Sequence, residues 1–104
     1  MIIAELKIVP LGVSGTSLSS YVSKAVKEIK NSGVEYQVHA TGTVIEAPSV
    51  EKVLKVTRKA HKAVLEAGAP RAITTLTFDE RTDKEEKMSD RVKKSPSKIV
   101  KIHL

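Results

Sequence analysis

Residues 34–47, VEYQVHATGTVIEA, decide the fold of this chain. Apolar and polar side chains alternate through the first half of this stretch, as in a half-buried β-strand. The alternation pairs Val34, Tyr36, Val38 and Ala40 with Glu35, Gln37, His39 and Thr41. Gly42 then allows a turn, and residues 43–47 continue as a second strand. The stretch therefore predicts a β-hairpin.

The segment before the hairpin predicts a strand followed by a helix. Residues 2–9, IIAELKIV, alternate like the hairpin strands, and Pro10 is expected to end them. From Leu18 the apolar side chains instead follow the period of a helix. This apolar stripe consists of Leu18, Val22, Ala25, Val26 and Ile29. The sequence Asn31-Ser32-Gly33 is a helix stop signal.

A second helix and a last strand follow the hairpin. Pro48 and Ser49 are expected to open the helix, and Gly68 to end it before Pro70. The threonine-rich residues 71–80, RAITTLTFDE, favour extended structure. The predicted order is therefore β-α-β-β-α-β, the split-βαβ or ferredoxin-like α+β sandwich. At 104 residues, the chain is expected to form a single domain, 1–104.

The C-terminal residues 84–104 depart from this pattern as a basic extension. Met88 and Val92, four residues apart, predict a short, weakly anchored helix that Pro96 ends. The apolar residues of KIVKIHL, 98–104, alternate again and predict a possible fifth strand at a sheet edge. A frayed basic terminus is the alternative for this segment.

Composition narrows the classes of function. The net charge is +6, which raises the possibility of nucleic acid as a partner, but much of the excess lies in residues 84–101. With one Phe, no Trp and two Tyr, the chain has few aromatic platforms for stacking bases. No run of side chains is apolar enough to span a membrane, and there is no cysteine. We expect a soluble cytoplasmic protein without nucleic-acid or membrane partners.

One face of the predicted sheet is left without helices. Its side chains are too mixed in polarity for a buried core, and they suit a polar subunit interface or a wet ligand site. His61 belongs to a second stripe on the second helix, beside Leu54 and Leu65, and is expected to make a packing or subunit contact. These uncovered surfaces predict a homotetramer, a dimer of dimers, with a dimer as the alternative.

Residues 10–22, PLGVSGTSLSSYV, place five hydroxyl side chains between the first strand and the first helix. Thr16 or Ser17 is expected to cap the helix, which leaves Ser19 and Ser20 near its N-terminus as a place for a polar ligand. The turn lacks the G-x-S-x-G motif of a nucleophile and the lysine of a phosphate-binding loop. The three histidines have no metal-ligand spacing. We therefore expect no catalysis, no metal and no cofactor.

Three segments together resemble the small thiamine-binding protein family of archaea, bacteria and yeast: IVPLGVSGTSLSSYV, YQVHATGTVIEA and AGAPRAITTLTFDERTDK. The resemblance covers residues 1 to about 94. It implies a ferredoxin-like fold, assembly into dimers and tetramers, and binding of thiamine or its hydroxymethylpyrimidine moiety without a catalytic step. An oligomeric regulatory or sensor module that acts on a protein partner is the alternative, since fold alone does not give function.

With such a ligand in view, one site is expected to join the start of the first helix to the hairpin. Hydroxyl groups and an imidazole could pair with the nitrogen atoms of an aminopyrimidine, and a carboxylate could accept from its amino group or offset a thiazolium charge. The residues expected to bind the ligand are Ser19, Ser20, His39, Thr41, Thr43 and Glu46.

Overall fold

The computed structural model describes residues 1–15, 18–85 and 87–88 of the chain. The elements are β1 (Ile2–Leu11), α1 (Leu18–Asn31), β2 (Glu35–His39), β3 (Gly42–Ala47), α2 (Val50–Glu66) and β4 (Arg71–Asp79). Their order confirms the predicted β-α-β-β-α-β arrangement and the ferredoxin-like α+β fold. The possible fifth strand and most of the predicted C-terminal helix lie outside the described residues.

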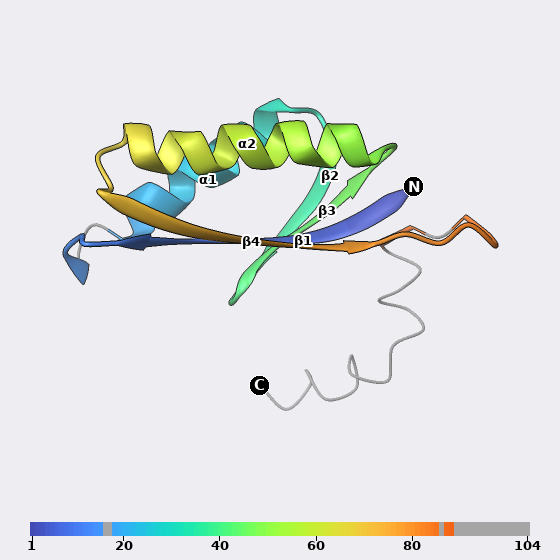
Figure 1. Cartoon of the computed structure of the whole chain (residues 1–104), viewed down its shortest axis with the longest axis horizontal. Coiled ribbons are helices and arrows are strands. Elements are labelled where there is room, and N and C mark those ends of the chain that lie inside the picture. The colour runs from blue at the N-terminus through green and yellow to red at the C-terminus, as the bar shows by residue number, and fades with distance from the viewer. Residues whose placement is uncertain (16–17, 86, 89–104) are drawn as a thin grey trace.

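The four strands form one antiparallel sheet in the order β2-β3-β1-β4, and both helices lie on the same side of it (Figure 1). β1 pairs with β3 from Ile2–Ala47 to Leu6–Thr43, and with β4 over its longer stretch, from Ile3 to Leu11. The inner strand β1 therefore extends beyond the residues over which it pairs with β3.

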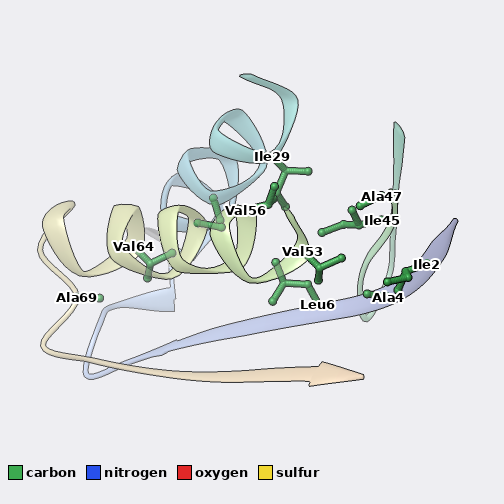
Figure 2. Packing of buried hydrophobic residues seen from close by; sticks show 12 residues of the cluster. Ile2, Ala4, Leu6, Ile29, Ile45, Ala47, Val53, Val56, Val64 and Ala69 are labelled. Carbon is green, nitrogen blue, oxygen red and sulfur yellow. The ribbon is translucent and has the colours of Figure 1, made fainter. Parts of the chain in front are cut away.

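The core lies between the sheet and the helices. Alternate residues of β1, Ile2, Ala4 and Leu6, form one cluster with Ile29 of α1 and the α2 stripe. Figure 2 shows Val53 and Val64 of this stripe pointing toward the sheet. The α2 stripe consists of Val53, Val56, Ala60 and Val64, each at most 1% exposed. The period-two pattern of the strand and the helical period of α2 thus bury one face of each element.

The predicted helix boundaries hold, but the hairpin turn falls at Ala40 and Thr41, and Gly42 is the first residue of β3. Ser49 caps α2, because its side chain accepts a hydrogen bond from the Lys52 backbone N–H at 3.1 Å. Gly33 and Gly68, which follow the two helices, have positive φ angles of 82° and 114°. The prediction that Pro10 ends the first strand is wrong, since β1 continues to Leu11. Proline is tolerated there because β1 has no strand on its β3 side at that position.

His61 makes a contact within the chain. Its Nδ1 atom lies 2.5 Å from Thr74 Oγ1, which joins α2 to the edge strand β4. Leu54 and Leu65 of the same helix remain 49% and 38% exposed. None of the described helices is long and apolar enough to cross a membrane.

Candidate functional site

The difference in length between β1 and β3 leaves a notch in the sheet. β3 begins at Gly42, and its last residue pair with β1 joins Thr43 to Leu6. Beyond that pair, residues 7–11 of β1 are bonded to β4 on one side only, within the part of the chain that the structure describes. The backbone groups that face away from β4 in this segment are therefore available to a ligand.

A pocket of about 340 Å³ occupies this notch. Its floor comes from residues 6–10 of β1, one wall from the first three turns of α1, and the other wall from residues 38–43 of the hairpin. Its volume is at the lower end of the range of about 300–1,000 Å³ that is usual for small-molecule sites. The pocket can hold a ligand of one or two rings.

The helix wall of the pocket is apolar. Leu18, Val22, Ala25, Val26 and Ile29 of α1 all line it. Leu18 and Val22 are 43% and 41% exposed, and Val38 across from them on β2 is 48% exposed. These side chains offer a surface against which the face of a flat ring can be buried.

The hairpin wall is polar and is organised around His39. The Thr41 backbone N–H donates to His39 Nδ1 at 3.4 Å, and Thr41 Oγ1 lies 3.2 Å from the same atom. Because Nδ1 accepts this hydrogen bond, the neutral imidazole carries its proton on Nε2. Nε2 is shielded from solvent and lies 3.2 Å from Glu5 Oε2, in a direction unsuited to a hydrogen bond. The ring is thus fixed between the turn and β1.

Gly42 makes this position of the imidazole possible. It stands opposite His39 in the hairpin, between His39 and β1. A Cβ atom at position 42 would lie 2.8 Å from the carbonyl oxygen of Leu6 and 3.7 Å from His39 Cε1. A side chain there would force the hairpin away from β1. The missing side chain lets His39 on β2 reach Glu5, two strands away.

The residues predicted to form the site are divided by the structure. His39, Thr41 and Thr43 line the pocket together. Ser19 lines an open groove that adjoins the pocket and shares Leu18, Val22, Val26 and Val38 with it. Ser20 lines neither the pocket nor this groove; its carbonyl oxygen accepts a hydrogen bond from Ser23 Oγ at 2.9 Å. The expected capping residues Thr16 and Ser17 lie outside the described residues.

Glu46 lies away from the pocket, on the side of the sheet that carries no helices. It pairs in register with Ile3 of β1 and Glu35 of β2, and is 8% exposed. Its Oε1 atom accepts a hydrogen bond from the Met88 backbone N–H at 2.8 Å. Thr43 and Glu46 are an odd number of residues apart on one strand, so their side chains point to opposite faces.

Sequence reasoning missed three features of the pocket: Lys7, the exposed apolar side chains of α1, and the open edge of β1. Among the described residues that line the pocket, only Lys7 and His39 have titratable side chains. A signal for the open edge was present, because the predicted strand from residue 2 was longer than the strand predicted at 43–47. The excess length had to extend past the hairpin turn.

A family model for thiamine-binding proteins matches residues 4–95. The chain belongs to this thiamine-binding protein family. Among its family relatives, a UPF0045 protein of Methanothermobacter thermautotrophicus is 42% identical over 99 residues, which cover 95% of this chain and 100% of the relative. The family resemblance seen in the three sequence segments is thereby confirmed.

Solved structures agree with this membership of the thiamine-binding family. A crystallised hypothetical protein of Methanocaldococcus jannaschii is 36% identical, with a TM-score of 0.81 over 88% of this chain and 92% of that one. A Thermotoga maritima protein, named as a candidate for thiamine biosynthesis or salvage, has a TM-score of 0.70 over 99% of this chain and 98% of that one. At 18% identity, the second comparison supports the fold alone.

Proposed function

We propose that the protein binds a small heteroaromatic molecule of the thiamine class, thiamine itself or its hydroxymethylpyrimidine moiety, and releases it unchanged. Membership of the thiamine-binding family supports the ligand class. The location of the binding site is supported by the pocket of about 340 Å³, in which the open edge of β1 faces the apolar wall of α1.

The chemistry of the pocket suits an aminopyrimidine. Such a ring presents a ring-nitrogen acceptor beside an amino donor on one edge, and a strand edge presents carbonyl acceptors and N–H donors. The faces of the ring would pack between Val22 and the hairpin, which would remove apolar surface from water. Thr41 and Thr43 supply hydroxyl groups that can donate or accept at the remaining ring atoms.

Binding without catalysis is supported by the state of the lining residues. General acid–base catalysis needs a titratable group within reach of the substrate proton. In the pocket those groups are Lys7 and His39, and the Nδ1 atom of His39 already accepts from the Thr41 backbone while Nε2 is shielded. We propose that binding of the ligand requires no cofactor.

Isothermal titration calorimetry with thiamine and with hydroxymethylpyrimidine tests this function. Val22→Phe should fill the pocket and remove the binding heat, because Val22 lines it. Lys59→Phe is the control, since Lys59 is exposed on α2 and lines neither the pocket nor the apolar surface proposed below as a subunit contact. Binding that survives Val22→Phe, or no binding of either compound by the wild-type protein at millimolar concentration, would refute the proposal.

We also propose a homotetramer built as a dimer of dimers. The outer edge of β4 has no partner strand among the described residues, and Ile73 and Phe78 on this strand are 46% and 41% exposed. Phe78 pairs with the buried Ala4 and lies on the face that carries the helices, as Leu54 and Leu65 of α2 do, whereas Ile73 lies on the opposite face. Each of these two apolar surfaces offers a contact to a further copy. Light scattering should give four times the 11.3 kDa mass of one chain, and a monomer mass would refute this assembly.

We place the protein in the cytoplasm, without a nucleic-acid or membrane partner. The lack of cysteine fits a reducing compartment. Cell fractionation should recover the protein with the soluble fraction. Gel mobility of RNA and DNA should stay unchanged at low salt, where phosphate contacts would be strongest.

A further inference from the structure

The pocket has an unbalanced charge. Lys7 lines it, while none of its lining residues is Asp or Glu. Across the described residues 1–15, 18–85 and 87–88, the Lys7 ammonium has no carboxylate within ion-pair distance. A carboxylate does lie close behind the hairpin wall, on Glu5, but it approaches His39 Nε2 at 3.2 Å and does not line the pocket.

This arrangement opposes a cationic ligand. Thiamine carries a fixed positive charge on its thiazolium ring. An apolar wall cannot replace the water that solvates this charge, so burying it is costly unless a carboxylate pairs with it. The Lys7 ammonium at the rim adds repulsion between like charges, which solvent weakens because the side chain is exposed.

The same arrangement favours an anionic group at the mouth of the pocket. Lys7 has the same parity along β1 as Ile3 and Glu5, so its exposed side chain lies on the helix-free face of the sheet, the face on which His39 lines the pocket. Its flexible four-carbon stem lets the ammonium follow a phosphate at the rim on that face. A neutral ring would meanwhile occupy the apolar part of the pocket and use the β1 edge and the hairpin hydroxyl groups. The Lys7 cation, which has no ion-pair partner among the described residues, would then find one in the ligand.

We propose that this pocket selects a planar heteroaromatic ring without fixed positive charge that carries a phosphate group, and that Lys7 is the residue that reads the phosphate. This inference rests on the proposed function, because it chooses among ligands of the same site. It predicts the affinity order hydroxymethylpyrimidine phosphate, then hydroxymethylpyrimidine, then thiamine.

Calorimetry with these three compounds and with thiamine monophosphate tests the order. In Lys7→Gln, binding of hydroxymethylpyrimidine phosphate should weaken about tenfold or more, because a charge-assisted hydrogen bond is lost. Binding of unphosphorylated hydroxymethylpyrimidine should change less than about twofold, since it does not use the charge. Lys7→Glu should reverse the preference and favour thiamine.

Lys55→Gln is the matched control. It removes the same charge from an exposed position on α2 that does not line the pocket, and should leave all affinities unchanged. Tighter binding of thiamine than of either pyrimidine would overturn this inference while leaving the proposed function intact. Equal weakening by Lys55→Gln and Lys7→Gln would also overturn it. No binding of any of the four compounds would overturn the proposed function, and the inference with it.

Discussion

The two ends of the β2–β3 hairpin are built in opposite ways. At the turn, Gly42 has no side chain, and the gap it leaves holds the His39 imidazole beside an open pocket. At the far end, Glu46 is covered and accepts a hydrogen bond from the Met88 backbone. Polar residues of one hairpin therefore line an open pocket at one end and hold the chain together at the other.

The covered end is fastened by the residues that follow β4. The chain leaves β4 at Asp79 and returns so that Met88 meets Glu46. The Met1 ammonium pairs with the Glu85 carboxylate at 2.8 Å, which ties the start of β1 to the same segment. These contacts lie at the start of β1, whereas the pocket lies toward its other end.

Adding a side chain at the open end should have the largest effect. In Gly42→Ala the new Cβ would meet the Leu6 carbonyl oxygen at 2.8 Å, so the hairpin must shift. We expect a loss of up to about 3 kcal/mol in the free energy of unfolding, measured with urea, and loss of ligand binding. Gly15→Ala is the control for stability, because a Cβ there meets nothing within 4 Å. Equal behaviour of the two variants would show that the gap at Gly42 has no role.

Removing the carboxylate at the covered end should affect stability alone. In Glu46→Ala the Met88 N–H loses its acceptor, and we expect a loss of about 1 kcal/mol in urea unfolding. Glu46→Gln keeps an oxygen that can accept this bond, and should cost less. Ligand affinity should stay within about twofold of wild type in both variants. A tenfold loss of affinity in Glu46→Gln would instead show that Glu46 belongs to the ligand site, as the sequence analysis predicted.

Two serines at the start of α1 test how far the ligand site extends beyond the pocket. Ser19 lines the groove beside the pocket, so Ser19→Ala should weaken binding by about 0.5–1.5 kcal/mol if its hydroxyl bonds the ligand. Ser20 lines neither hollow, so Ser20→Ala should leave the affinity unchanged. Calorimetry of the two variants gives the comparison, and a larger effect at Ser20 would contradict this placement. Both changes should leave stability equal or slightly higher, since alanine is the better helix former.

The smallest effect is expected in the segment between β4 and Met88, which contacts Glu46 at the covered end of the hairpin. The Arg81 guanidinium donates to the Asp83 carboxylate and lowers the pKa of Asp83 to about 2. Because the folded-state pKa is depressed, this pair favours the folded state at pH values above the unfolded pKa of about 4. That contribution disappears as the pH falls through about 2. It should be slight, since Asp83 is fully exposed.

An NMR titration of the Asp83 carboxyl carbon measures this pKa. Arg81→Gln should raise it toward the ordinary value for aspartate. Lys84→Gln should change it much less, because Lys84 contributes the smallest of the lowering effects. Similar shifts in the two variants would contradict the assignment to Arg81.

Much of the architecture was predictable from local pattern. The alternation in residues 34–47, the helical stripe of α2 and the cap at Ser49 each depend on residues near one another in sequence. Side chains of a strand alternate between its two faces, so Thr43 and Glu46, three residues apart on β3, point to opposite faces. Grouping the two residues in one site overlooked this alternation. Whether the six predicted residues bind a ligand stays a prediction.

The order of the elements and the faces that their side chains take follow from local pattern, because propensity and periodicity act over a few residues. Where the strands stop overlapping depends instead on how the whole chain packs. That offset leaves the edge of β1 open, brings Lys7 and Val22 to one pocket, and lets His39 pass over Gly42 toward Glu5. The return of the chain to cover Glu46 likewise depends on the packing of the whole chain. These features join residues far apart in the chain, and their position follows from how whole elements pack against one core.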